Sequence, residues 1–278
     1  TISSGAASGI SPEELCERLE RAAKTPGTRA LVLRISSPGG DAIAAEAIRE
    51  KLAAIRARGI HVVASMGDTA ASGGYWISLG AERIIADPLT LTGSIGVFSV
   101  IPDAEGLLAE FDVGRDGYRT GELAEFGSPL HRPNAAESAI LRSGVERVYD
   151  RFKALAANNR GRTEAEIEKV AQGRVWTGAQ ALEHGLVDSL GDLSDAVKVA
   201  RQLADLPDDA PVRYFDAEPD GMSALVAKLS GEVLAMVPKS ASMRLFLLPV
   251  ASEPEWQRLE ALLKSRRVLA WAEVPEGI

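Results

Sequence analysis

The chain has 278 residues, of which 46% are hydrophobic and 25% charged, a composition typical of a soluble globular protein with a sizeable core. Its formal net charge of −8 argues against a nucleic acid partner, because phosphate binding requires a basic stripe that the sequence lacks. The single cysteine, Cys16, excludes an internal disulfide, and no metal-ligand spacing exists, so we expect neither a metal nor a cofactor. No run approaches the ~18 apolar residues that a membrane-spanning helix needs.

Apolar spacing and helix-start residues predict the elements in chain order. Ser11 and Pro12 provide an N-cap and a first helical proline for a helix over 12–24. The elements expected after it are strand 30–35, helix 41–58, strand 60–65, a short helix 75–79, strands 83–86 and 95–101, helix 103–111, an extended stretch 113–118, a long loop 121–134, helix 135–158, a short helix 163–171, a helix from 177 to 184 and a helix from 192 or 194 to 204. This alternation predicts an α/β fold with a parallel sheet and crossover helices.

The chain changes texture beyond Pro207, where prolines recur and no motif is found. We therefore assign residues 1–206 to one domain and residues 207–278 to a peripheral carboxy-terminal segment. Within that segment we expect a helix at 254–265 and a strand at 268–272. The chain starts Thr-Ile-Ser without a signal peptide, and we expect it to be a fragment of a longer protein.

A serine among small residues lies at the centre of the site prediction. Ser72 stands in Ala70-Ala71-Ser72-Gly73-Gly74, between the predicted strand 60–65 and the predicted helix 75–79. The small neighbours leave its hydroxyl uncovered, and unpaired backbone N–H groups at a helix start would favour an oxyanion there. The alternative is an N-cap serine beside glycines that only permit tight packing, and for this stretch alone that alternative is favoured.

A second glycine pair, Gly39-Gly40, changes this balance. It follows the strand 30–35, and ligands in α/β sheets collect outside the carboxyl ends of parallel strands. Both glycine turns therefore fall on the same edge of the sheet. The amides of Gly40 and Gly73, beside the Ser72 hydroxyl, would supply an oxyanion hole and a nucleophile for acyl transfer.

The general base is missing from this set. His61 opens a strand that looks buried, His184 precedes a glycine at a helix end, and His131 lies in the loop 121–134, so for each a structural role is favoured. No lysine occurs between Ser72 and residue 135, and Lys51, Lys153 and Lys169 sit on helix faces with acidic neighbours.

At these residues the sequence resembles the bacterial signal peptide peptidases, also called protease IV. These are Ser-Lys proteases in the same fold superfamily as Clp protease and crotonase. The resemblance covers about residues 27–205 and is closest to the carboxy-terminal half of the long, two-repeat form. The segments that carry it are 37–40, 66–67 with 70–76, 91–97, Gly173 with 175–178, and 185–191.

The resemblance implies a Clp/crotonase-like fold with Ser72 as nucleophile and the amides of Gly40 and Gly73 as the oxyanion hole. It implies that Ser94 hydrogen-bonds the catalytic lysine. In short family members this lysine precedes a Gly-Ser-Pro, and the corresponding position here is Ala124. In the long form the lysine comes from the amino-terminal repeat, so we expect the base to come from outside this chain.

We therefore predict a serine endopeptidase that binds an extended apolar peptide, such as a signal-peptide remnant, as an added strand beside Gly39-Gly40. Two alternatives remain open: a non-catalytic scaffold or assembly half, because the chain lacks its own base, and a crotonase-like acyl-CoA enzyme. The resemblance also implies a homo-oligomer with sites at repeat interfaces. It further implies a place at the cytoplasmic membrane, facing the periplasm, through an anchor outside this chain.

Overall fold

The computed structural model describes residues 2, 10–114 and 116–215. The chain divides into two compact units, Thr1–Pro211 and Val212–Ile278. The predicted helix 254–265 and strand 268–272 lie outside the described residues.

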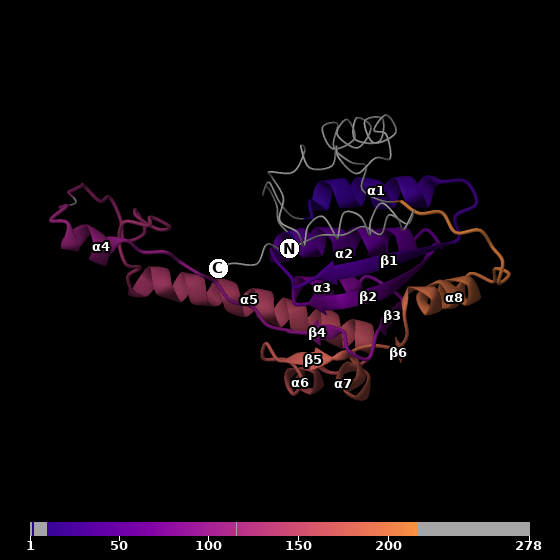
Figure 1. The fold of residues 1–278 in the computed structure, drawn as a ribbon. Helices are drawn as coiled ribbons and strands as arrows, with labels where there is room; N and C mark the ends of the chain where they lie inside the picture. Colours follow the sequence, from indigo (N-terminus) through magenta and orange to yellow (C-terminus); the bar gives the residue numbers. More distant parts are fainter. Residues whose placement is uncertain (1, 3–9, 115, 216–278) are drawn as a thin grey trace, which may run out of the picture. The chain divides into compact units, whose positions relative to one another are not determined.

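The described residues form an α/β arrangement (Figure 1). The strands are β1 (Ala30–Ser37), β2 (His61–Ala71), β3 (Arg83–Ala86), β4 (Leu91–Gly93), β5 (Val175–Thr177) and β6 (Ser189–Leu190). The helices are α1 (Pro12–Lys24), α2 (Ala42–Arg56), α3 (Gly73–Ser78), α4 (Glu105–Glu110), α5 (Ala135–Arg160), α6 (Glu164–Glu168), α7 (Gly178–Glu183) and α8 (Leu193–Leu203).

Side-chain caps define where most of these helices begin. Ser11 Oγ accepts a hydrogen bond from the Glu14 amide at the start of α1, as its sequence predicts. Reciprocal capping boxes open α5, α6, α7 and α8. At the far end of α5, Gly161 adopts a left-handed conformation with φ 63°, which stops the helix.

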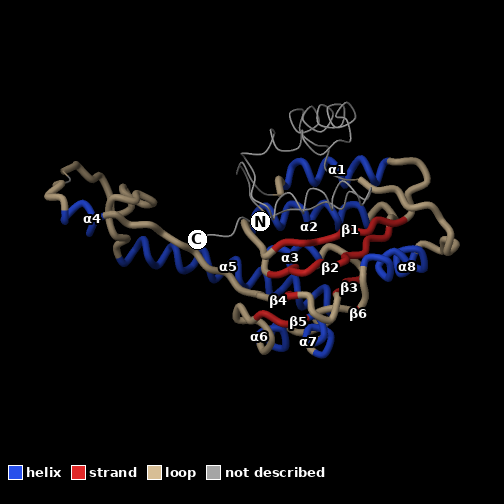
Figure 2. The backbone as a smooth tube through the Cα atoms, in the orientation of Figure 1, coloured by secondary structure: helices blue, strands red, loops and turns tan. Residues whose placement is uncertain are grey.

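The strands form one mostly parallel sheet in the order β5-β4-β2-β3-β6, with β1 also paired to β2 (Figure 2). Only the β4–β5 pair is antiparallel among the pairs of the described strands. The predicted α/β class with a parallel sheet is confirmed, with this antiparallel pair as an addition. Strand β2 pairs with three others, so it is the centre of the sheet.

The two faces of β2 belong to two apolar clusters, as its period-2 alternation requires. Val62, Ala64 and Met66 are fully buried in the larger cluster, which includes side chains of α2, α3 and α5. Val63 faces the other way and packs with Ile85 and with apolar residues of α8. Helices therefore cover the sheet on both sides.

Strand β2 changes partner halfway along its length. Its first half pairs with β3, from Val63↔Arg83 onward, and its second half pairs with β4, up to Ala71↔Gly93. Between the halves, the pairing of β2 with β1 skips residues 67–69, so these residues form a bulge. Buried Thr90 fixes the bulge, because its Oγ1 donates to the Gly67 carbonyl at 2.7 Å.

The structure corrects several predicted elements. The strand predicted at 95–101 is wrong, because the strand here is β4, and Gly93 (φ 75°) and Ser94 (φ 49°) then turn the backbone out of the sheet. In the following segment Phe98 and Val100 are 86% and 78% exposed. The stretch 113–118 contains no strand among its described residues, and β2 continues to Ala71 rather than ending at residue 65. Strands β5 and β6 were not predicted.

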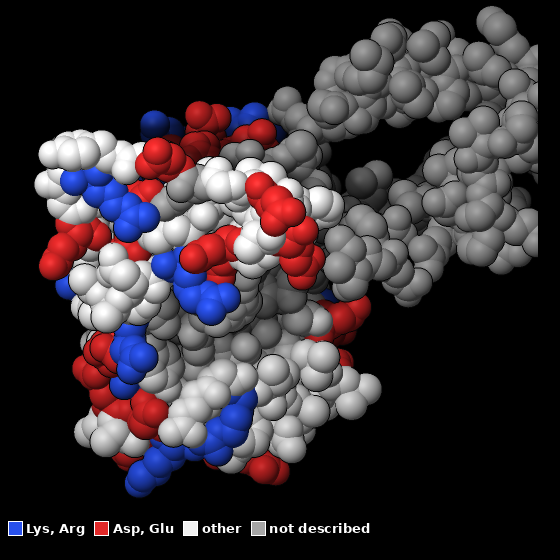
Figure 3. Space-filling view, turned by 90° about the vertical axis from the view of Figure 1, so that its left-hand side faces the viewer, with Lys and Arg blue, Asp and Glu red and all other residues white. Residues whose placement is uncertain are grey.

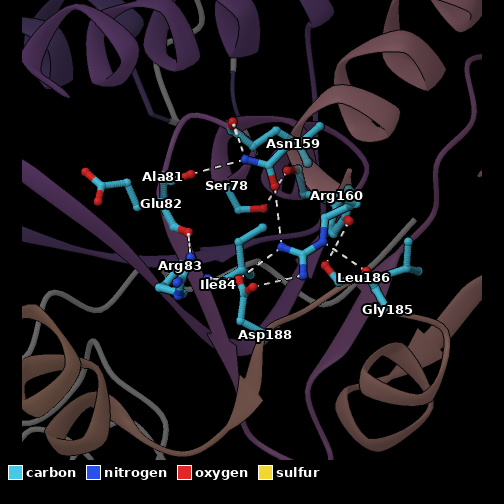
Figure 4. A network of polar contacts seen from close by, with 12 residues as sticks. Ser78, Ala81, Glu82, Arg83, Ile84, Asn159, Arg160, Gly185, Leu186 and Asp188 are labelled. Atoms are coloured by element: carbon cyan, nitrogen blue, oxygen red, sulfur yellow. Dashed lines mark hydrogen bonds and ion pairs between the residues drawn. The ribbon is translucent and has the colours of Figure 1, made fainter. Parts of the chain in front are cut away.

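Polar contacts fasten the end of α5 to the loop after α3 and to the edge of the sheet (Figure 4). The Arg160 guanidinium, whose side chain is 9% exposed, donates two hydrogen bonds to the Asp188 carboxylate at 3.0 and 3.1 Å. Asp188 also accepts from the Ile84 amide of β3 at 2.7 Å. Asn159 donates to the carbonyls of Leu79 and Ala81. This network holds the segment 185–191 against β3.

The described surface carries charges of both signs. On the face shown in Figure 3, acidic and basic side chains are interspersed rather than gathered into a basic band. None of the helices within residues 10–114 and 116–215 combines the length and the hydropathy that a membrane-spanning helix requires.

Candidate active site

Ser72 occupies a sharp turn between β2 and α3. Its backbone angles, φ 50° and ψ −116°, lie outside the regions that non-glycine residues normally populate. Two hydrogen bonds hold this conformation: the Ser72 amide donates to the Gly93 carbonyl at 2.9 Å, and the Ser72 carbonyl accepts from the Trp76 amide at 2.8 Å. A serine on a strained strand-to-helix turn presents its hydroxyl outward, which is the geometry of a nucleophile in many hydrolases.

Ser72 does not have the geometry of a helix N-cap, which is the alternative interpretation of this residue. An N-cap serine has extended backbone angles and accepts a hydrogen bond from an amide of the first helical turn. Ser72 stands at the N-cap position of α3, but its side chain makes no capping hydrogen bond and its φ is positive. The strained conformation of Ser72 therefore needs a reason other than capping.

The Gly39-Gly40 turn lies directly against Ser72, as the shared sheet edge predicted. A Cβ on Gly39 would fall 2.8 Å from Ser72 Cβ and 3.2 Å from Ser72 Oγ. The Gly39 backbone has φ 125°, which side chains rarely adopt, and its amide donates to buried Ser37 Oγ at 3.2 Å. Glycine is required at position 39 by both the conformation and the space.

The amides of Gly40 and Gly73 are close together and available. A Cβ on Gly73 would lie 3.2 Å from the Gly40 nitrogen, and Gly40 itself is exposed. Among the described residues, neither amide donates a hydrogen bond. Two unpaired N–H groups beside a serine hydroxyl are suited to hold a negatively charged oxygen.

Ser94 is placed beside Ser72 by the pairing of β2 with β4. The register ends at Ala71↔Gly93, and the Ser72 amide donates to the Gly93 carbonyl, so Ser94 directly follows a hydrogen-bond partner of Ser72. Ser94 also has positive φ, 49°, and is half-buried. Its amide donates to the Arg174 carbonyl at 2.8 Å, so the chain just before β5 supports this position.

Strand β5 also braces the Gly93-Ser94 turn. A Cβ on Gly93 would come 2.8 Å from Trp176 Cδ1, so the indole ring fills the space beside this glycine. Trp176 is anchored by its Nε1–H, which donates to the Val170 carbonyl at 2.9 Å. The sequence contains the segment 173–178, but its packing against Gly93 could not be deduced from so short a strand as β5.

Helix α3 is held by a partly buried charge network that reaches it from α2 and α5. Glu46 of α2 accepts hydrogen bonds from Trp76 Nε1 at 2.7 Å, from Arg49 Nε at 2.6 Å and from Arg151 Nη2 at 2.9 Å. Burial alone would raise the pKa of this carboxyl, but these donors lower its pKa to about 2. The charged Glu46 therefore ties α2 and α5 to the helix that follows Ser72.

The histidines have structural partners. His61 Nδ1 lies 3.0 Å from Glu82 Oε2, and His131 Nε2 lies 3.0 Å from Glu137 Oε2. The ring of His184 packs edge-on against that of Trp176, with 4.2 Å between centroids. The structural roles favoured for all three therefore agree with their contacts.

The described lysines offer no base at Ser72 either. Lys24 and Lys51 pair with Glu20, Lys153 pairs with Asp150 and Glu168, and Lys198 pairs with Asp195. Lys169 is exposed at the end of α6. Within residues 10–114 and 116–215, no hydrogen bond links a lysine or histidine to Ser72 or Ser94, and no group of His, Cys, Asp and Glu could hold a metal.

Ile2 is a contact residue of this site that sequence reasoning missed. It is fully buried, and its main chain bonds to Gly39 and Asp41 on either side of Gly40. No sequence signal identifies it, because a single isoleucine near the start of the chain has no periodic context.

Comparison with known proteins identifies the family. The sequence model described as Peptidase family S49 matches residues 54–207. The chain is 46% identical over 215 residues to Protease 4 of Salmonella typhi and 41% identical over 202 residues to Protease 4 of Haemophilus influenzae. These alignments cover 77% and 72% of this chain, but 34% and 32% of the relatives.

A shorter relative matches as well. The chain is 33% identical over 197 residues to a protein named putative signal peptide peptidase SppA of Enterococcus faecium. The alignment covers 71% of this chain and 57% of that protein. The chain thus spans about a third of the length of the two Protease 4 relatives. The match over more than half of its residues, together with these identities, shows that the chain belongs to peptidase family S49.

Proposed function

We propose that this chain is the carboxy-terminal repeat of a serine endopeptidase and that Ser72 is its nucleophile. The observation that supports the proposal most directly is the strained Ser72 turn, which has no capping role and lies beside two unpaired amides. Membership of family S49 supports the same reaction class, and no observation favours the acyl-CoA alternative.

In the proposed reaction, Ser72 Oγ attacks the carbonyl carbon of a peptide bond while its proton passes to a neutral lysine amine. The carbonyl oxygen becomes an oxyanion that accepts hydrogen bonds from the amides of Gly40 and Gly73. The protonated lysine then gives its proton to the leaving peptide nitrogen, which leaves an ester on Ser72. Water hydrolyses this ester, with the lysine again taking and returning the proton.

We propose that the lysine comes from an amino-terminal repeat of the same protein and that Ser94 hydrogen-bonds it. The position of Ser94 next to Ser72 supports this assignment, as does the absence of a base among the described residues. The lengths of the Protease 4 relatives leave room for such a repeat.

The proposal extends to substrate, assembly and location. The substrate is an extended apolar peptide, such as the remnant of a signal peptide, in keeping with the name of the Enterococcus relative. The complete protein is a homo-oligomer at the cytoplasmic membrane, facing the periplasm. These assignments rest on the family resemblance.

A fluorophosphonate probe tests the nucleophile, with the labelled residue identified by mass spectrometry. This chain alone and the chain joined to its amino-terminal repeat are compared. We expect labelling of Ser72 only in the joined protein, and its loss, with loss of peptide cleavage, in Ser72→Ala. Ser36→Ala, at an exposed serine near the end of β1, is the matched control and should label normally.

Two results would contradict this assignment. Peptide cleavage that survives Ser72→Ala would exclude Ser72 as the nucleophile. An absence of labelling in the joined protein, at a probe concentration that labels a known serine peptidase, would support a scaffold half. The missing base is the observation that favours that second function.

A further inference from the structure

We propose that Ile2 is a positioning residue for the oxyanion hole, holding the amides of Gly40 and Gly73 in place from behind. The inference rests on the proposed function, since it concerns the same two amides. It assigns a role to a residue outside the glycine and serine motifs, near the start of the sequence.

The main chain of Ile2 brackets Gly40. The Ile2 amide donates to the Gly39 carbonyl at 2.9 Å, and the Asp41 amide donates to the Ile2 carbonyl at 3.0 Å. These two bonds form a parallel bridge between Ile2 and Gly40. Successive N–H groups of an extended chain point to opposite sides, so the Gly40 amide points away from Ile2. Fixing both neighbours of Gly40 therefore fixes the direction of its amide.

The space between Ile2 and the turn is fully used. A Cβ on Gly40 would fall 2.0 Å from the Ile2 carbonyl oxygen and 2.7 Å from the Ile2 nitrogen. The Gly40 backbone also has φ 146°, one of the many conformations open to glycine, so contacts rather than a preference of the residue itself must fix the turn. The Ile2 main chain supplies contacts of this kind.

The side chain of Ile2 reaches the second amide donor. Ile2 is 0% exposed and belongs to the main apolar cluster. The position that a Cβ of Gly73 would take lies 3.3 Å from Ile2 Cδ1 and 3.2 Å from the Gly40 nitrogen. One residue therefore contacts both halves of the candidate oxyanion hole, by main chain at Gly40 and by side chain at Gly73.

The substitution Ile2→Val tests the side-chain contact with little risk to folding, because valine lacks only the Cδ1 atom that lies beside Gly73. Ile2→Ala enlarges the effect. Ile55→Val and Ile55→Ala are matched controls: Ile55 is also 0% exposed in the same cluster but lies at the other end of α2, roughly 20 Å from the turn.

The variants are made in the assembled protein, that is, in this chain joined to its amino-terminal repeat. They are compared by kcat, by KM and by inhibition with a peptide boronate, and the fluorophosphonate probe counts the active sites. We expect kcat to fall about 10-fold in Ile2→Val and about 10²-fold in Ile2→Ala, with KM unchanged. The boronate, whose adduct with Ser72 is tetrahedral, should lose affinity by the same factors. The Ile55 variants should lose thermal stability but keep kcat per active site.

Each other outcome overturns the assignment. Equal losses of kcat in the Ile2 and Ile55 variants would mean that Ile2 acts only through stability. Unchanged kcat in Ile2→Val and Ile2→Ala, with cleavage lost in Ser72→Ala, would refute the role of Ile2 and leave the proposed function standing. Cleavage retained in Ser72→Ala would refute both. If Ile2→Ala does not fold, Ile2→Val decides.

Discussion

The substitution Gly39→Ala is the most direct test of the geometry around Ser72, because it adds a single methyl group at the point of closest approach. The new Cβ would stand 2.8 Å from Ser72 Cβ and 3.0 Å from the Gly73 nitrogen. It would therefore press on the proposed nucleophile and on one proposed oxyanion donor together.

The size of the effect follows from these distances. Carbon atoms in contact prefer about 3.5–4.0 Å, so Ser72 and residue 39 must separate by about 1 Å. A displacement of about 1 Å at a reacting group costs about 10²-fold in rate. The variant also places a side chain at φ 125°. Backbone strain and overpacking together should cost about 2–6 kcal/mol of stability.

Gly59→Ala separates crowding at Ser72 from backbone strain. Gly59 also has positive φ, 82°, but a Cβ there would meet nothing within 4 Å. Labelling of Ser72 by the fluorophosphonate probe, followed over time in the assembled protein, should slow about 10²-fold in Gly39→Ala and stay normal in Gly59→Ala. Normal labelling of Gly39→Ala, or equal slowing of both variants, would refute the geometric reasoning.

Three further predictions concern the surroundings of the site. Trp176→Ala should lower kcat about 10-fold by releasing Gly93, whereas Trp176→Phe should keep most activity, and kcat of the assembled protein measures both. Glu46 has a folded-state pKa of about 2, below its unfolded value, so its stabilisation is complete above about pH 4.5 and is lost as pH falls towards 2. Urea unfolding should show a loss of up to about 3 kcal/mol over this range, and Glu46→Gln should flatten it. Asp188→Ala should cost about 1–3 kcal/mol in the same assay, because it removes the carboxylate that pairs with the Arg160 guanidinium and accepts from the Ile84 amide.

Helices with explicit start and stop residues could be predicted from the sequence. The helix expected at 12–24 is observed as α1. The helix expected at 135–158 is observed as α5 and continues slightly further, to Arg160. Residues next to the helices determine these boundaries: Ser11 caps the start of α1, and Gly161 ends α5. Such elements need no knowledge of their neighbours.

Strands could be predicted less well, because a strand exists only with a partner. The run 95–101 is apolar and β-branched, yet Ser94 at positive φ turns it out of the sheet. Strands β5 and β6 are three and two residues long and are defined by their pairing with β4 and β3. No periodicity exists in segments of that length.

In the candidate site, too, some features could be predicted from the sequence and others depend on distant partners. That the Gly39-Gly40 turn approaches Ser72 and Gly73 could be predicted, since the carboxyl ends of neighbouring parallel strands share an edge. The positive φ of Ser72 and the contacts of Ile2 could not, because they depend on hydrogen bonds to residues distant in the chain.

The bulge at residues 67–69 divides β2 into two parts with different neighbours. The first part is paired with β3, and the second, which leads to Ser72, is paired with β4 and through it with β5. Substitutions along β3 and along β4 therefore share few contacts, and their effects on stability should be additive. Over evolutionary time, the strands around the active serine could accept changes independently of those that complete the far edge of the sheet.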